Sequence, residues 1–318
     1  MHVVIDTDTA GDDVVALLLA LKTPWVTVEG VTINCGNVAF DFQVENALKT
    51  IDVAGRAGAV PVYPGARAPL LRDWVSADYV HGKDGMGEAF FPPVSQRPER
   101  ENAVPFLLRT ARQYSGDLVV VAQAPLTNLA LAVRQDPAFA SHVKELWVMG
   151  GSLSGLGNVA PLSEYNFYVD PEAAAIVFGA GFNLYMVGWD VALEAAVLTE
   201  EELQRIEAMN TPLSQFFLAT QAKVLEFNRT QSIAGTTHPD ALTMALALDR
   251  RLLRESRDYF VAIETRGEFT RGTSVVDRLG VWRQKPNSHV VTQVDRDRFH
   301  ALLLRLLEEG ATRLPEPR

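Results

Sequence analysis

The sequence predicts a single α/β domain, spanning residues 1–318, in which a mostly parallel central sheet is flanked by helices. Short apolar segments alternate with helix-like segments through residues 1–200, which is the rhythm of the βα units that build parallel sheets. No internal repeat, low-complexity tract or linker-like stretch divides the chain. A chain of 318 residues, 47% of them hydrophobic, is also long enough to bury a large core.

The expected strands are short segments rich in apolar residues, as in parallel sheets whose strands are buried on both faces. They cover residues 3–5, 25–33, 60–63, 118–122, 143–149, 184–187, 259–265 and 289–294. The expected helices carry apolar residues at helical spacing, as Phe299, Leu302 and Leu303 do. They cover residues 14–21, 44–54, 103–115, 126–134, 171–178, 200–209, 213–227, 241–253 and 296–309. Residues 67–100, rich in Pro, Gly and charge, are expected to form a long loop of functional importance.

Composition excludes several classes of function. The formal net charge of −10 and the pI near 5.1 argue against an extended nucleic-acid-binding surface. No apolar stretch is long enough to span a bilayer, and Asp6 interrupts the apolar run that a signal peptide would need. The single cysteine, Cys35, allows no intrachain disulfide and is expected to be a small buried hydrophobe. A cytoplasmic protein with no nucleic-acid or membrane partner is expected.

Four aspartates lie at the turn between the first expected strand and the first expected helix: Asp6, Asp8, Asp12 and Asp13. Helix capping accounts for Asp12 and Asp13 but not for the Asp6-x-Asp8 pair at the strand end. So many carboxylates repel one another unless a cation or protons offset their charge. Oxygen ligands suit hard cations such as calcium or magnesium. We therefore expect a metal or catalytic site at this turn, where open α/β folds bind ligands.

Two other motifs are considered and set aside. Asp6-x-Asp8 after an apolar strand resembles the nucleophile motif of haloacid-dehalogenase-type phosphatases, but that motif expects Thr or Val where this chain has Ala10. Residues 155–160 match a G-x-G-x-x-A dinucleotide pattern. The preceding strand ends several residues too early, however, and Pro161 interrupts the helix that should follow. Neither motif accounts for the acidic pair that follows Gly11.

The string from Asp6 to Asp13 resembles the D-x-D-x-G-x-D-D signature of the inosine–uridine-preferring nucleoside hydrolases, with Ala10 in place of the family's Gly. Further matches follow in the family's order and cover nearly the whole chain. They are Gly36-Asn37, His81 to Gly85, Ala124 to Ala130, Met149 to Gly151, Asn158, Glu164 to Asn166, Asp170 to Ala173 and Asp240 to Leu242. The resemblance implies a nucleoside hydrolase-like fold with a Rossmann-like core.

The resemblance also implies a reaction, the hydrolysis of the N-glycosidic bond of a ribonucleoside to ribose and a free nucleobase. Such a reaction passes through an oxocarbenium-like sugar and needs an activated water. By resemblance, Asp8, Asp13, Asp240 and the backbone carbonyl of Gln123 ligate a calcium ion. Asp8 then takes the proton of the metal-bound water.

The substrate-contacting residues implied by the resemblance are polar or aromatic. They are Asp12, Asn37, His81, Asn158, Glu164, Tyr165, Asn166 and His238. Glu164 and Asn166 are two residues apart in an expected extended stretch, so both are expected to face the ribose. His81 lies in the long loop and Tyr165 is expected to stack on the base. By family analogy the protein is expected to be a homodimer or homotetramer.

One difference from the family concerns the group that helps the base to leave. Inosine–uridine enzymes carry His directly before the last metal aspartate, but here the order is His238-Pro239-Asp240. Proline donates no proton, and its fixed φ redirects the side chain before it. The preferred base and the leaving-group acid are therefore undetermined. Two alternatives stay open: hydrolysis of an unusual or modified ribosylated substrate, and a catalytically weak nucleoside-binding relative.

Overall fold

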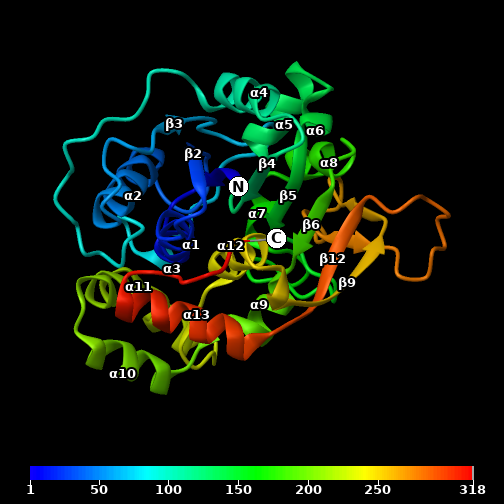
Figure 1. Ribbon diagram of the computed structural model, residues 1–318. Helices are drawn as coiled ribbons and strands as arrows, with labels where there is room; N and C mark the ends of the chain where they lie inside the picture. Colours follow the sequence, from blue (N-terminus) through cyan, green and yellow to red (C-terminus); the bar gives the residue numbers. More distant parts are fainter. Residues whose placement is uncertain (317–318) are drawn as a thin grey trace.

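An eight-stranded sheet forms the centre of the computed structural model, which describes residues 1–316 (Figure 1). The strand order is β3-β2-β1-β4-β5-β6-β12-β9, and every neighbouring pair is parallel except β12 and β9. The strands are β1 (His2–Thr7), β2 (Thr27–Ile33), β3 (Val62–Pro64), β4 (Leu118–Ala122), β5 (Val143–Met149), β6 (Leu184–Val187), β9 (Leu253–Tyr259) and β12 (Ser288–Val294). The mostly parallel sheet expected from the sequence is confirmed.

Helices cover both faces of the sheet because strand residues alternate between two apolar cores. Val3 and Ile5 of β1 belong to one core and Val4 to the other. The first core is covered by α1 (Gly11–Leu21), α2 (Phe40–Val53), α9 (Trp189–Ala195), α10 (Glu200–Met209), α11 (Pro212–Thr230), α12 (Pro239–Leu248) and α13 (Arg296–Glu309). The second core is covered by α4 (Ala103–Gln113), α5 (Thr127–Gln135), α6 (Phe139–His142) and α8 (Pro171–Phe178). One sheet between two helical layers makes a single α/β domain.

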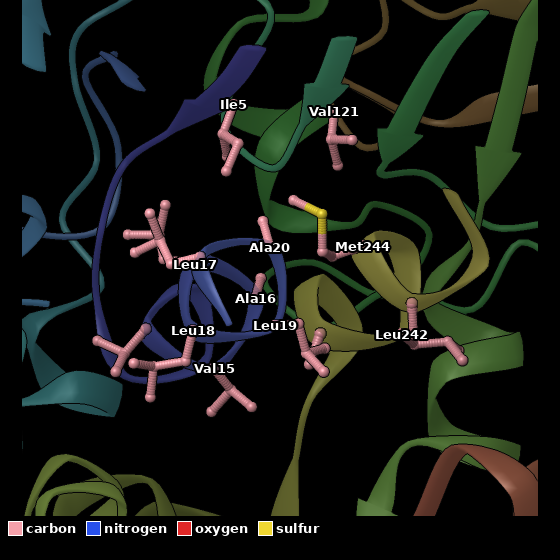
Figure 2. Packing of buried hydrophobic residues seen from close by; sticks show 14 of the residues in the cluster. Ile5, Val15, Ala16, Leu17, Leu18, Leu19, Ala20, Val121, Leu242 and Met244 are labelled. Carbon is pink, nitrogen blue, oxygen red and sulfur yellow. The ribbon is translucent and has the colours of Figure 1, made fainter. Parts of the chain in front are cut away.

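Helix α1 is buried along its whole length, which fixes the acidic residues of its first turn. Its side chains pack under Ile5 of β1 and Val121 of β4 and beside Leu242 and Met244 of α12 (Figure 2). Replacing a buried leucine of such a core with alanine costs about 2–5 kcal/mol. The helix is therefore a rigid support for the carboxylates at its N-terminus.

The direction of winding reverses between β1 and β4. From β1 the chain moves outward through β2 and β3, and it returns on the other side of β1 as β4, followed by β5 and β6. A crevice forms at the carboxyl ends of the strands where the order reverses. The carboxyl ends of β1 and β4 lie side by side there, since the N–H of Gln123, the residue after β4, donates a hydrogen bond to the carbonyl of Asp6 in β1 at 2.8 Å.

The structure differs from the expected elements after α12. The helix expected over residues 241–253 ends at Leu248, and a short 3-10 helix (Arg250–Leu252) leads into β9. Asp249 ends α12 by capping that turn, since its Oδ1 accepts a hydrogen bond from the Arg251 N–H at 3.1 Å. The single strand expected over residues 259–265 is wrong. β9 ends at Tyr259, and a separate strand, β10 (Val261–Ile263), follows it.

Several short elements carry no sequence period long enough to predict them. Two small antiparallel pairs join β7 (Val197–Leu198) with β8 (Thr236–Thr237), and β10 with β11 (Ser274–Val276). Within residues 67–100 a four-residue helix, α3 (Asp78–His81), interrupts the expected loop, and α7 (Tyr165–Val169) follows the loop after β5. In the described part of the chain, no helix is both long and apolar enough to cross a membrane.

Candidate active site

A cavity of about 340 Å³ opens at the carboxyl ends of the strands. It brings together most of the predicted site residues. Its lining includes Asp12, Asn37, His81, Gln123, Asn158, Glu164, Tyr165, Asn166 and Asp240. Asp8 and Asp13 are fully buried behind this lining. The volume falls in the range of small-molecule sites.

Three carboxylates form the acidic end of the cavity. Ligand atoms of Asp12, Asp13 and Asp240 all lie within 4.8 Å of one another. Asp12 and Asp13 come from the first turn of α1, and Asp240 comes from the first turn of α12. Asp12, expected to contact ribose, thus also lies within reach of a metal. The expected ligand Asp8 lies next to this group rather than within it.

Asp13 is held by three donors. The Ala10 N–H and the Asn37 amide donate to its Oδ2 at 2.9 and 3.3 Å, and the Thr7 hydroxyl donates to its Oδ1 at 2.5 Å. The bond from Ala10 is also a cap on α1, so the capping function expected for Asp13 is confirmed. Asp13 therefore caps the N-terminus of α1 and also faces two other carboxylates.

Asp8 has one oxygen fixed and one oxygen free. Its Oδ2 accepts the Asn37 N–H at 2.9 Å, whereas its buried Oδ1 accepts no hydrogen bond from residues 1–316. A Cβ at Gly36 would lie 1.8 Å from Oδ2, so only glycine leaves room for the Asp8 carboxylate. An unpartnered buried carboxylate oxygen is costly unless a ligand completes it.

The site is electrostatically unbalanced. No Lys, Arg or His nitrogen of the described chain lies within 4.0 Å of the carboxylates of Asp8, Asp12, Asp13 or Asp240. Burial and the neighbouring Asp12 charge raise the pKa of Asp13 to about 8. Burial and the surrounding aspartates raise the pKa values of Asp8 and Asp240 well above the ordinary value. Oxygen donors without a cationic partner fit a hard divalent cation.

Gln123 joins the acidic end to the opposite wall of the cavity. Its backbone carbonyl accepts the Asn166 amide at 3.3 Å, and its own side-chain amide donates to the Asp240 carbonyl at 2.9 Å. Asn166 also donates to the Met149 carbonyl at 3.1 Å. These bonds place the Gln123 carbonyl, expected as a metal ligand, at the cavity wall beside Asn166.

Glu164 and Asn166 do not lie in an extended stretch, as the sequence analysis expected. Glu164 is the N-cap of α7, and its carboxylate accepts the N–H groups of Gly151, Asn166 and Phe167. Both side chains nevertheless line the cavity, because the cap orients one and the first helical turn orients the other. Burial raises the pKa of Glu164 to about 7.

The remaining predicted contacts have defined partners. Asn158 Oδ1 accepts the Tyr165 N–H at 2.9 Å, and the Tyr165 hydroxyl donates to the Val75 carbonyl at 2.6 Å. His81 lies at the end of α3 rather than in an open loop, and burial lowers its pKa. Its Nδ1 is buried without a partner in the described chain. His81 is therefore a neutral imidazole on the cavity wall.

The structure does not bring His238 into the cavity. The imidazole is fully buried, its Nε2 lies 2.8 Å from the Thr236 hydroxyl, and its ring centroid lies 5.3 Å from that of Phe217. Pro239 lines the cavity in its place. Burial lowers the pKa of His238 to about 3, so its ring is a neutral imidazole and not an imidazolium acid at neutral pH. The expectation that His238 contacts substrate is corrected accordingly.

Other residues singled out in the sequence have structural roles outside the cavity chemistry. Cys35 is buried, as expected for a small hydrophobe. Asp170 caps α8, since its Oδ1 accepts the Ala173 N–H at 3.0 Å. The glycine-rich segment 155–160 precedes no helix comparable to that of a dinucleotide fold and instead ends in an isolated bridge between Ala160 and Ser163.

The apolar half of the cavity was not predicted from the sequence. Tyr79 of α3, Trp189 of α9 and Phe227 of α11 line it together with Leu156 and other apolar side chains. Tyr79 and Phe227 meet edge to face, with ring centroids 5.5 Å apart. Aromatic residues scattered on separate helices give no local signal, so only the fold brings them together. This wall offers apolar contact to a planar ring.

The chain is similar in sequence to known ribonucleoside hydrolases. Residues 3–301 match the family model for inosine-uridine preferring nucleoside hydrolases. The chain is 34% identical over 310 residues to the pyrimidine-specific ribonucleoside hydrolase RihA of Salmonella arizonae, covering 97% of this chain and 98% of the relative. It is 35% identical over 308 residues to RihA of Shewanella woodyi, covering 96% and 97% of the two chains.

Two solved structures share the fold. The plant nucleoside hydrolase PpNRh1 superposes with a TM-score of 0.90 at 31% identity, covering 96% of this chain and 98% of that one. The purine-preferring ribonucleoside hydrolase from Gardnerella vaginalis gives 0.91 at 29% identity, covering 98% and 99%. Fold and site together define an enzyme that hydrolyses ribonucleosides. The chain belongs to the inosine–uridine preferring nucleoside hydrolase family.

Proposed function

We propose that this enzyme is a calcium-dependent hydrolase of the ribosyl N-glycosidic bond in which Asp8 is the general base. The observation that carries the proposal is the free Oδ1 of Asp8 beside the carboxylates of Asp12, Asp13 and Asp240. The excess negative charge of this group matches a divalent cation. The absence of sulfur and imidazole ligands in the group favours calcium over transition metals.

The residues present fit such an ion. Asp8, Asp13, Asp240 and the Gln123 carbonyl would hold it, and Asp12 lies close enough to share it. When bound, calcium orients the attacking water and makes it more acidic. Asp8 Oδ1 then accepts the proton of that water, while the Asn37 N–H keeps Oδ2 in place.

The ribose lies between the acidic end and α7 in this proposal. Ribose hydroxyls donate to Asp12 and Glu164, whose carboxylates face the cavity, and the Asn158 and Asn166 side chains complete the set. The N–H groups that cap α7 hold the Glu164 carboxylate in position. The same carboxylates stabilise the positive charge that develops on the sugar.

The base lies against the apolar half of the cavity, where Tyr79, Trp189 and Phe227 offer flat or edge contacts. His238 is not part of the cavity lining, and the Tyr165 hydroxyl already donates to the Val75 carbonyl. His81 also lines the cavity, and its Nε2, unlike the enclosed Nδ1, makes no hydrogen bond within the described chain and is not enclosed, so we assign to this nitrogen the contact with the leaving part of the substrate.

The test is a screen of common ribonucleosides for ribose release by protein treated with EGTA, before and after calcium is restored. Release that depends on calcium supports the proposal. The position of His238 favours one alternative, a nucleoside-binding relative with weak turnover. That alternative requires measurable nucleoside binding without release of ribose or free base from any common or modified ribonucleoside.

Self-association into a dimer or tetramer is part of the proposal. Four exposed apolar side chains on the arm between β10 and β12 support a contact with a second copy of the chain: Phe269, Leu279, Val281 and Trp282. Light scattering after size-exclusion chromatography tests this contact. Leu279→Glu should lower the mass, whereas Leu71→Glu, at a comparably exposed leucine outside the arm, should not. Equal masses for the two variants would contradict it.

A further inference from the structure

We infer that Asn228 binds the nucleobase by presenting its Oδ1 as a fixed hydrogen-bond acceptor, so that the preferred substrates carry an N–H on the outer edge of the base and analogues without that N–H are disfavoured. This inference rests on the proposed function, because it assumes that a nucleoside occupies the cavity. Asn228 lies in the last turns of α11, next to Phe227 in the apolar half of the cavity.

The orientation of the Asn228 amide is determined by its partner. Its Nδ2 donates to the Gly235 carbonyl at 3.0 Å. The opposite orientation would place Oδ1 against that carbonyl oxygen, and two acceptors do not bond. The amide therefore cannot rotate to offer its N–H groups to a ligand without losing a buried hydrogen bond.

The Gly235 carbonyl is itself held rigidly. Gly235 has a φ of +109°, and a Cβ at this position would lie 1.8 Å from the Leu198 carbonyl oxygen. The next residue, Thr236, pairs with Leu198 in the small β7–β8 sheet. The backbone carbonyl of Asn228 accepts the N–H groups of Gln231 and Ile233, each at 3.0 Å, which fixes the turn between α11 and Gly235.

Oδ1 is left free by these contacts. This oxygen accepts no hydrogen bond from any described residue, and the protein does not enclose it completely. Since Asn228 is only 3% exposed and lines the cavity, the accessible part of the residue is the part that faces the cavity. A neutral acceptor that cannot turn away is a site for a donor.

The chemistry of the bases defines which ligand fits. Uracil carries an N–H at N3, hypoxanthine and guanine carry one at N1, and cytosine and adenine carry exocyclic amines. The nearby Thr237 hydroxyl also belongs to the lining, but a hydroxyl both donates and accepts and so discriminates poorly. Asn228 is thus a group beside the apolar half of the cavity whose polarity is fixed, and a base without an edge N–H leaves its Oδ1 unpaired.

The experiment compares kcat/KM for two substrate pairs, uridine with 3-methyluridine and inosine with purine riboside. The second pair removes the donor without adding bulk. In the wild type the donor-bearing member of the cleaved pair should be preferred, and Asn228→Ala should reduce that preference by about 5- to 150-fold. Comparing each ratio between wild type and variant cancels the intrinsic difference between leaving groups.

Thr237→Val is the matched control, since it removes a polar group from the same wall and should leave both ratios within about threefold of wild type, a change of less than 1 kcal/mol. Unchanged ratios in Asn228→Ala would overturn the inference. If Asn228→Ala does not fold, product inhibition of the wild type decides: uracil should inhibit more tightly than 3-methyluracil, and hypoxanthine more tightly than 1-methylhypoxanthine. Equal inhibition would overturn it. Failure of the wild type to cleave any ribonucleoside would instead overturn the proposed function.

Discussion

Asn37 bonds to both Asp8 and Asp13. Its N–H donates to Asp8 Oδ2 at 2.9 Å, and its amide donates to Asp13 Oδ2 at 3.3 Å and to the Asp8 carbonyl at 3.4 Å. Asn37 follows β2, so these bonds tie the loop after β2 to the acidic turn after β1. They hold two like charges side by side without a cationic side chain.

Replacing Asn37 should therefore weaken calcium binding without unfolding the protein. Asn37→Ala removes the side-chain donor but keeps the N–H that holds Asp8, and loss of a group that orients metal ligands typically costs about 10- to 100-fold in affinity. Isothermal titration with calcium measures the effect. Asn183→Ala, an exposed asparagine remote from the cavity lining, is the control. Equal calcium affinities in the two variants would show that Asn37 does not organise the site.

Calcium binding should depend on pH because Asp13 must lose a proton. Its pKa is raised to about 8 in the metal-free protein, against 3.8 ordinarily. Between these values folded Asp13 keeps a proton that the unfolded chain has released, so the free energy of unfolding of the metal-free protein falls as pH rises through this window. Calcium affinity rises over the same window and levels off above it.

Thermal unfolding from about pH 5 to pH 9, in EGTA and in calcium, tests this linkage. The increase in Tm on adding calcium should grow with pH. An increase that is constant across the range would mean that the carboxylates are already ionised before calcium binds.

His238→Ala should reduce kcat/KM by less than about tenfold, below the 10²–10⁴-fold contribution typical of a general acid. The imidazole is buried away from the cavity and its pKa is lowered to about 3. The variant should instead change the free energy of unfolding and its dependence on pH. Between pH 6.5 and about 3 the unfolded chain binds a proton that folded His238 does not, so wild-type stability falls with decreasing pH there. Loss of the alkaline limb of the pH–rate profile in the variant would reinstate His238 as the acid.

The enzyme is expected to recognise the sugar through hydrogen bonds to its hydroxyl groups. Asp12, Asn158, Glu164 and Asn166 all line the cavity, and a missing hydroxyl leaves buried polar groups without a partner. Sites built to bond a hydroxyl reject analogues that lack it by up to about 10⁴- to 10⁵-fold. Ribonucleosides should exceed 2′-deoxyribonucleosides in kcat/KM by several orders of magnitude. Comparable values for the two sugars would show that these residues do not bind the 2′-hydroxyl.

The sequence predicted those features that have a local cause. Continuous apolar runs such as 3–5 and 118–122 predicted buried parallel strands, and the crowding of Asp6 to Asp13 after the first of these runs predicted the acidic site. The extended stretch expected at Glu164 was wrong, because a five-residue helix has too few turns to show a period and forms here around the cap.

Features that depend on the fold could not be predicted. The sequence indicated that Pro239 would redirect His238, but not that the imidazole would pack against Phe217 of another helix. The apolar half of the cavity combines Tyr79, Trp189 and Phe227, which lie on three helices far apart in sequence. Only the winding of the chain determines that they share one wall.

Asp8 is the residue of the acidic turn that we propose as the general base of the calcium-dependent reaction. Asp6 is a matched comparison, since it is two residues away, equally buried and also has one carboxylate oxygen, Oδ2, without a partner in the described chain. It differs because its Oδ1 is bonded to Thr32 at 2.6 Å and to Asn128 at 2.8 Å, and because the charges of Asp12 and Asp13 raise the pKa of Asp8 but not that of Asp6. Calcium content and ribose release should be measured together on purified Asp8→Asn and Asp6→Asn. The predicted result is that Asp6→Asn keeps stoichiometric calcium and most of its turnover, while Asp8→Asn loses at least about 10²-fold in kcat. Wild-type turnover in Asp8→Asn would contradict the assignment of Asp8 as the base.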